Sequence, residues 1–145
     1  MRAVALLTAA MLSVMACAKS ETPAADTPSM AAASEADVAG TWSGVSMLEG
    51  SDSVAARWTQ VCGGGSCKGT VEGSADTIMS TYRIEGDSVI GMSSAYMDPN
   101  FKANVIDSWM ARPKDGKVSG TQVTKLADKD SVVARTRFDG TRAPQ

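Results

Sequence analysis

Residues 104–127 read NVIDSWMARPKDGKVSGTQVTKLA, and this stretch indicates the fold class most clearly. Two runs rich in Val, Ile, Thr and Trp, residues that favour strands, lie on either side of Asp115-Gly116. Asp and Gly both tolerate the positive φ angles of a type I′ turn, a tight connection between antiparallel strands. The stretch therefore predicts a β-hairpin with strands at 104–113 and 117–127.

The same pattern extends over the chain from Gly40 onward. Short runs of strand-forming residues alternate with Gly, Asp and Ser at intervals of about ten residues, which is typical of sandwiches and barrels. Eight strands are expected, at 40–48, 54–62, 67–73, 76–85, 88–97, 104–113, 117–127 and 131–141. Because nearly every connection is short, successive strands should be antiparallel neighbours, and eight of them can close on themselves. We predict an all-β fold, an antiparallel up-and-down meander that forms a closed barrel.

The N-terminus has the features of an export signal. Arg2 supplies a positive charge, and residues 3–14 are apolar but too few to cross a bilayer, which takes roughly 20 residues. Val-Met-Ala precedes Cys17 directly. The run resembles a bacterial lipobox, which implies that residues 1–16 are a signal peptide and that Cys17 carries a diacylglycerol. The alternative is an ordinary secretory peptide in which Cys17 has no special role.

The segment after Cys17 looks like a tether. Residues 18–37 contain no aromatic residue and no Val, Ile or Leu, so they lack the apolar surface needed to fold. We therefore divide the mature chain into the lipidated cysteine with a disordered tether, 17–37, and a barrel domain, 38–145. Lys19 follows the cysteine and no Asp lies next to it, which resembles outer-membrane sorting. We expect a lipid-anchored protein of the cell envelope, at the outer membrane, facing the periplasm or the cell surface.

The composition argues against several functions. The chain has 14 basic and 16 acidic residues, and its scattered basic residues form no nucleic-acid footprint. It has no histidine, the commonest general base and metal ligand. There is no Gly-x-Ser-x-Gly or Ser-x-x-Lys motif either. We expect no enzyme, no catalytic residues, no metal and no cofactor, although a pair of carboxylates that converge in space stays an open alternative.

Cys62 and Cys67 are expected to form a disulfide. Two cysteines in an oxidising envelope tend to pair. The spacing Cys-Gly-Gly-Gly-Ser-Cys suits two strand ends that face each other across a glycine-rich hairpin tip. Two thiolates without histidine make an incomplete zinc shell, and a redox site would more often have the Cys-x-x-Cys spacing.

Gly40-Thr41-Trp42 opens the first strand and resembles the Gly-x-Trp motif of lipocalin-like and avidin-like (calycin-like) barrels. The resemblance implies that Trp42 closes one end of the barrel and stacks on a basic residue of the last strand, Arg142 or Arg137. The later lipocalin motifs and the avidin biotin contacts are not found, so the resemblance assigns no ligand residues.

Large side chains in the strands are the candidates for a ligand cavity: Trp42, Trp58, Tyr82, Met92, Tyr96 and Trp109. The alternation of a strand places Met92 and Tyr96 on one face together with Ile90. Methionine adapts to irregular apolar ligands, so such a face suits a binding cavity. The alternative is that these side chains only pack in the core.

Two functions are compatible with these features. The first is a non-catalytic binding module for a small apolar or amphipathic ligand. The second is a protein-interaction module, either an accessory subunit of an envelope complex or an inhibitor of a secreted enzyme. The expected contacts for the second are the 98–103 loop, with Phe101, and the hairpin tip between Cys62 and Cys67.

Overall fold

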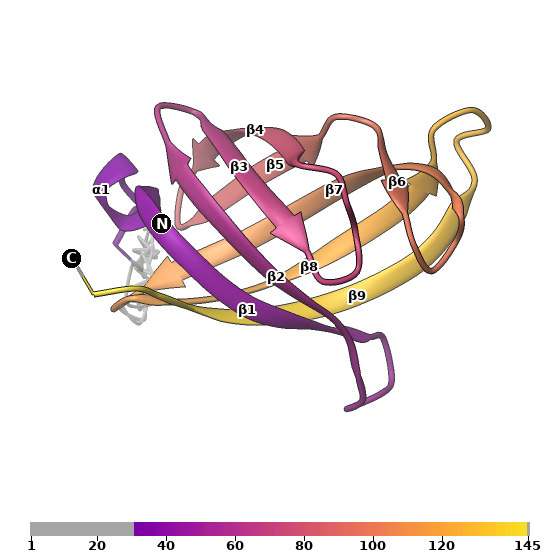
Figure 1. Cartoon of the computed structure of the whole chain (residues 1–145). Helices are drawn as coiled ribbons and strands as arrows, with labels where there is room; N and C mark the ends of the chain where they lie inside the picture. The colour runs from indigo at the N-terminus through magenta and orange to yellow at the C-terminus, as the bar shows by residue number, and fades with distance from the viewer. Residues whose placement is uncertain (1–30, 145) are drawn as a thin grey trace, which may run out of the picture.

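The computed structural model describes residues 31–144 (Figure 1). The predicted signal peptide 1–16, Cys17 and the predicted tether up to residue 30 lie outside this range. The elements are α1 (Glu35–Val38), β1 (Gly40–Leu48), β2 (Val54–Gly63), β3 (Ser66–Val71), β4 (Ile78–Glu85), β5 (Ser88–Ser93), β6 (Tyr96–Asp98), β7 (Ala103–Lys114), β8 (Lys117–Leu126) and β9 (Val132–Arg142). None of the described residues belongs to a helix long and apolar enough to cross a membrane.

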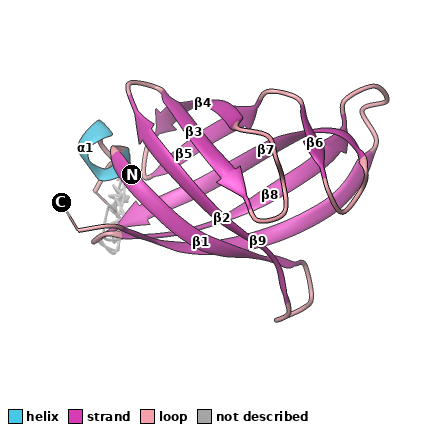
Figure 2. Cartoon of the chain, viewed as in Figure 1, coloured by secondary structure: helices cyan, strands magenta, loops and turns pink. Residues whose placement is uncertain are grey.

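The strands form a closed antiparallel barrel, which confirms the predicted fold (Figure 2). Each strand of the barrel pairs with the next one in the chain, and β9 pairs with β1 to complete the ring. Closure pairs each of the eight barrel strands on both sides, and only the short additional strand β6 has a single partner, β7. The hairpin between β7 and β8 has the expected two-residue turn, with φ of 52° at Asp115 and 70° at Gly116.

One predicted strand, 88–97, is two strands in the structure. β5 pairs with the second half of β7 and belongs to the barrel, whereas β6 pairs with the first half of β7 as an additional strand. Between them, both the backbone N–H and the hydroxyl of Ser94 donate to the carbonyl of Met79, at 2.7 and 3.1 Å. This interruption separates the two ladders.

The interruption also corrects the predicted shared face of Ile90, Met92 and Tyr96. Tyr96 is buried, whereas Met92 is 55 % exposed on the outside of the barrel. Side chains alternate between the two faces only along a continuous strand, and the break after Ser93 resets the alternation.

Trp42 closes one end of the barrel, with Arg142 as its basic partner. The Trp42 side chain is 3 % exposed, and its indole N–H donates to the carbonyl of Val38 at 2.7 Å. The Arg142 guanidinium carbon lies 5.5 Å from the centre of the Trp42 ring, a cation–π contact. The other candidate, Arg137, instead bonds to the carboxylate of Asp52.

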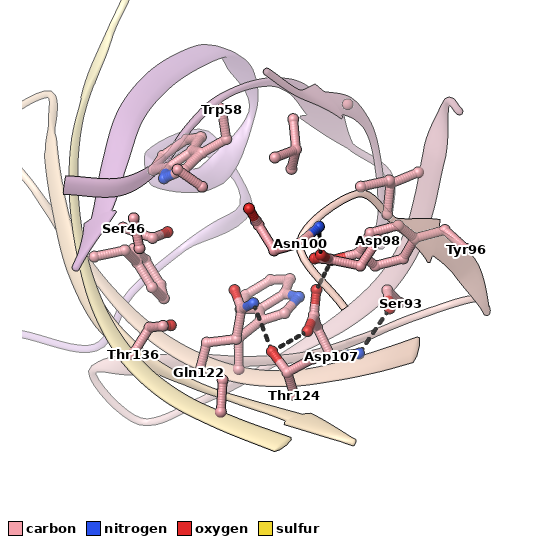
Figure 3. A pocket seen from close by; sticks show the side chains of 18 of the residues that line it. Ser46, Trp58, Ser93, Tyr96, Asp98, Asn100, Asp107, Gln122, Thr124 and Thr136 are labelled. Atoms are coloured by element: carbon pink, nitrogen blue, oxygen red, sulfur yellow. Dashed lines mark hydrogen bonds between the residues drawn. The ribbon is translucent and has the colours of Figure 1, made fainter. Parts of the chain in front are cut away.

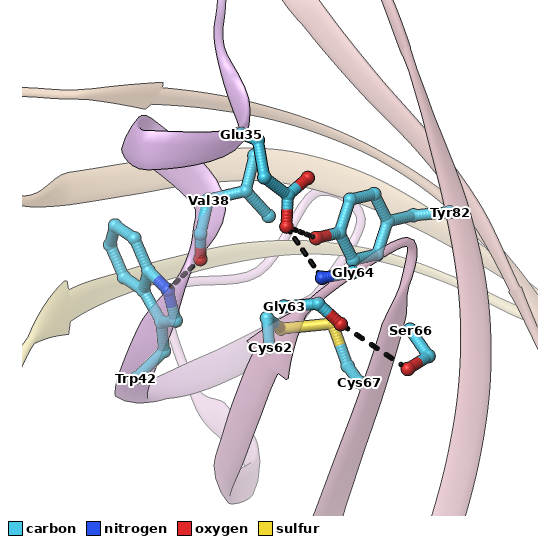
Figure 4. Close-up of a disulfide and its surroundings, with 9 residues drawn as sticks. All are labelled: Glu35, Val38, Trp42, Cys62, Gly63, Gly64, Ser66, Cys67 and Tyr82. Atoms are coloured by element: carbon cyan, nitrogen blue, oxygen red, sulfur yellow. Dashed lines mark hydrogen bonds between the residues drawn. A yellow bond between two sulfur atoms is a disulfide. The ribbon is translucent and has the colours of Figure 1, made fainter.

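The predicted disulfide between Cys62 and Cys67 is present at the same end, where it joins β2 to β3 (Figure 4). The turn between the two cysteines uses positive φ angles at Gly64 and Gly65, which glycine adopts without strain. The disulfide and the turn close the tip of this hairpin, which lies beside α1.

The first three residues of helix α1, Glu35–Asp37, lie in the segment expected to be tether, and its last residue, Val38, lies in the predicted barrel domain. One carboxylate oxygen of Glu35 accepts hydrogen bonds from the Gly64 N–H and the Tyr82 hydroxyl, both at 2.6 Å (Figure 4). Val38, at the end of the helix, is buried against the closed end. The last residues of the 17–37 segment therefore belong to the barrel. The composition of the segment could not show this, because the donors come from β4 and from the turn between β2 and β3.

Three large rings lie about halfway along the barrel, each over glycines of neighbouring strands. A Cβ atom on Gly91 would lie 2.1 Å from the Trp109 ring, and one on Gly44 would lie 2.4 Å from the Trp58 ring. Phe138 occupies the space over Gly120 in the same way, again at 2.4 Å. The rings of Trp58 and Phe138 meet edge to face, with centres 6.0 Å apart. These rings pack on the buried residues of the closed end.

The packing of the Trp109 ring over Gly91 can be tested by mutation. Gly91→Ala should destabilise the protein by about 1–3 kcal/mol, because the added methyl group forces the indole ring to move. Gly63→Ala is the matched control, since a Cβ there would meet nothing within 4 Å. Guanidinium unfolding of both variants measures the difference. Equal stabilities for the two variants would contradict the proposed packing.

Candidate functional site

The half of the barrel beyond the three rings is hollow. A cavity of about 550 Å³ lies there, within the range of small-molecule sites. It reaches the end of the barrel opposite α1, where Leu48, Val71 and Phe101 contribute to its lining. All nine strands contribute residues to the wall.

Three of the six predicted ligand residues line this cavity, namely Trp58, Tyr96 and Trp109. The prediction is corrected for the other three. Trp42 and Tyr82 point inward but belong to the filled, closed end. Met92 lies on the outer surface because of the break between β5 and β6.

The wall also carries polar side chains that are not among the six predicted ligand residues (Figure 3). They are Ser46, Ser80, Ser93, Asp98, Asp107, Gln122, Thr124 and Thr136. Asp107 could have been found by alternation, since it lies two residues before Trp109 in β7 and so shares its face. Alternation alone does not show which face of the strand is the inner one, and aspartate usually lies on the outer, solvent-facing side. The sequence therefore contained no indication that Asp107 is buried.

Asp107 is the centre of a hydrogen-bond network and is 6 % exposed. The Tyr96 hydroxyl donates to one carboxylate oxygen at 2.7 Å, and the Thr124 hydroxyl donates to the other at 2.6 Å (Figure 3). The backbone N–H of Asp107 donates to the Ser93 hydroxyl at 2.9 Å. Gln122 donates in turn to the Thr124 hydroxyl at 3.4 Å. Groups from three other strands, β5, β6 and β8, therefore hold Asp107 in the cavity wall.

Burial raises the pKa of Asp107, although the hydrogen bonds from Thr124 and Tyr96 act in the opposite direction. The negative charge of Asp98 raises the Asp107 pKa further. Burial, followed by the charge of Asp107, also raises the pKa of Tyr96, which keeps this hydroxyl protonated as a donor.

Asp98 is the second carboxylate of the wall and is 7 % exposed. One of its oxygens accepts the backbone N–H groups of Asn100 and Phe101, at 2.7 and 3.2 Å. These bonds hold the loop after β6, so that Phe101 lines the cavity while it stays 39 % exposed. Asp98 thus fixes the conformation of the loop at the mouth of the cavity and also places an acidic side chain there.

One fully buried side-chain oxygen among the lining residues has no hydrogen-bond partner. The hydroxyl oxygen of Thr136 is buried and makes no hydrogen bond with any described residue. Buried hydroxyl groups nearly always have a partner in folded proteins.

The two surfaces predicted for a protein partner do not form one face. The tip between Cys62 and Cys67 lies at the closed end, where Glu35 binds it. Phe101 lies at the mouth of the cavity, at the other end of the barrel. Within residues 31–144, no cluster of three or more His, Cys, Asp or Glu side chains could hold a metal ion.

Comparisons with protein families, with curated proteins and with solved structures find no match to this chain. The resemblance to lipocalin-like and avidin-like barrels stays a prediction. The closed barrel and the contact between Trp42 and Arg142 are compatible with it.

The raised pKa of Asp107 predicts how stability depends on pH. The folded chain binds this proton more readily than the unfolded chain, whose pKa is near the ordinary 3.8. The contribution of Asp107 to stability therefore increases as the pH falls from neutrality through the raised pKa toward 3.8. Asp107→Asn, which cannot ionise, should be at least as stable as the wild type near pH 7 and should lose this advantage in acid. Urea unfolding at several pH values measures the difference.

The matched control is Asp139→Asn, which removes an exposed carboxylate from β9. Its stability relative to the wild type should not show the same trend. A stability advantage of Asp107→Asn that grows as the pH falls would contradict the direction of the Asp107 pKa.

Proposed function

We propose that the barrel is a non-catalytic binding module that holds a small amphipathic molecule in its cavity. The observation that carries the proposal is the 550 Å³ cavity, which has aromatic rings on one part of its lining and a polar network on another. Sites for small molecules are typically concave and largely apolar, with a few placed polar groups.

The apolar part of the ligand would contact the rings of Trp58, Trp109 and Phe138. Aromatic rings provide large rigid surfaces for apolar contact. The polar part would meet the network around Asp107. A purely apolar ligand would cover polar lining residues such as Asp98, Asp107 and Gln122 without offering them a polar partner, which favours an amphipathic molecule.

We also propose that the barrel is held at a membrane of the cell envelope by a lipid on Cys17. The support is the lipobox-like sequence and the apolar-poor segment that follows it. The described chain joins the barrel at its closed end, where Ala33 donates to the carbonyl of Gly86 at 2.8 Å. The described chain therefore begins at the end of the barrel opposite the cavity mouth.

Ligand entry can be tested with the full chain and the neutral apolar dye N-phenylnaphthylamine, whose fluorescence increases in apolar sites. The wild type should bind the dye, with energy transfer from Trp58 and Trp109. Ala134→Trp should reduce dye binding by about tenfold or more, because Ala134 lines the cavity and the indole ring would fill it.

Thr121→Trp adds the same ring on the exposed face of β8 and serves as the control. It should leave dye binding unchanged. Equal binding by the two variants would show that the dye lies outside the cavity, and absence of binding by the wild type would overturn the proposal.

The anchor has a separate test. Cys17→Ser should move the protein from the membrane fraction to the soluble fraction of its own cells, and the wild-type intact mass should include a lipid. The double variant Cys62→Ser/Cys67→Ser loses the disulfide but keeps Cys17, so it should stay with the membrane. Membrane association of Cys17→Ser would contradict lipidation.

A further inference from the structure

We infer that the polar end of the ligand is a cation, a protonated amine or a quaternary ammonium group next to an apolar body. The inference rests on the proposed function and adds the chemical class of the ligand. Three observations support it: the acidic residues of the cavity wall, the neutral donors that bond to their carboxylates, and the aromatic rings that line the same cavity.

The wall is negatively charged and contains no positive side chain. Of the 25 residues that line the cavity, Asp98 and Asp107 are acidic and none is Lys or Arg. The five ion pairs among residues 31–144 involve neither of these two carboxylates. The basic members of those pairs, such as Arg57, are substantially exposed. The charge of the wall is therefore not balanced within the described part of the chain.

The hydrogen bonds to these carboxylates come from neutral groups. Asp107 accepts hydrogen bonds from the hydroxyl groups of Tyr96 and Thr124. Asp98 accepts hydrogen bonds from two backbone N–H groups. Neutral donors offset only part of the cost of removing a carboxylate from water, and a charged donor offsets more. A cationic group in the cavity would supply the missing positive charge.

The rings of the cavity favour the same charge. Trp58, Trp109, Tyr96 and Phe138 present aromatic surface to the interior. The face of an aromatic ring attracts a cation, most strongly in Trp, and attracts it more when water is excluded. An anionic ligand such as a fatty acid would instead meet two carboxylates at short range, which is unfavourable in a poorly solvated site.

Binding of a cation should weaken in acid. The groups that face Asp107 are Tyr96 and Asp98 from β6, Ser93 from β5, and Gln122 and Thr124 from β8. Tyr96 stays neutral over the accessible range, because burial and the charge of Asp107 raise its pKa. The raised pKa of Asp107 means that its charge is lost on acidification before that of an ordinary aspartate.

The test uses calorimetry on the full chain with three probes of one length: octylamine, octanol and octanoate. Near pH 7 octylamine is protonated, since alkylamines titrate near the lysine value of about 10.4. Octylamine should bind at least about tenfold more tightly than octanol, and octanoate should bind most weakly. The affinity for octylamine should fall on acidification, whereas that for octanol should not.

Asp107→Asn should lower the affinity for octylamine toward that for octanol, because Asp98 is then the only acidic residue of the cavity lining, and it should leave the affinity for octanol unchanged. Asparagine keeps an oxygen acceptor for Tyr96, so the cavity should keep its shape. Asp139→Asn removes one negative charge from the outer surface and should leave all three affinities as they are.

The outcomes separate the two proposals. If octanol or octanoate binds as tightly as octylamine, the cavity binds amphipathic molecules but the cationic class is wrong. If none of the three probes binds, both the cationic class and the proposed function are wrong. The wild-type series decides between these results even if a variant fails to fold.

Discussion

The rest of the structure depends on the packing of three aromatic rings over glycines in the middle of the barrel. Trp58 lies over Gly44, Trp109 over Gly91, and Phe138 over Gly120, at positions where a Cβ atom would collide with the ring. Interior packing tolerates neither overlap nor voids, so these pairs set how close the strands can approach. The rings also divide the interior. The closed end is filled by buried side chains, and the open end keeps a cavity of about 550 Å³.

The contents of the two ends follow different physical rules. At the closed end the polar groups are matched within the protein: the Trp42 indole N–H has the Val38 carbonyl, and Glu35 has two donors. At the open end Asp107 is buried beside a second carboxylate without a positive partner. Such an arrangement costs stability, because the charged form is removed from water. A buried carboxylate that lowers the stability of the fold is more readily explained by a role in ligand binding than by a role in folding.

Much of the fold could be predicted from local chemistry. The Asp115-Gly116 turn, the strand runs and the short connections led to the barrel, and the spacing of Cys62 and Cys67 led to the disulfide. The break at Ser94 could not be predicted, because its partner is the Met79 carbonyl of a neighbouring strand. The position of Met92 was wrong for that reason. The buried carboxylate of Asp107 was missed because nothing in the local sequence distinguishes a buried strand aspartate from an exposed one. The groups that donate hydrogen bonds to Asp107 lie in other strands, β6 and β8.

The sequence by itself determined most of the strands and the disulfide, and it predicts that Cys17 is a lipid attachment site. Each of these depends on neighbouring residues: alternation, turn chemistry, or the spacing of a few side chains. Only the tertiary structure decided which end of the barrel is filled and which aromatic residues reach the cavity. It also brought Asp98 and Asp107 into one wall without a cation. The physical reason is closure, since residues from nine strands meet in the interior only when β9 pairs with β1.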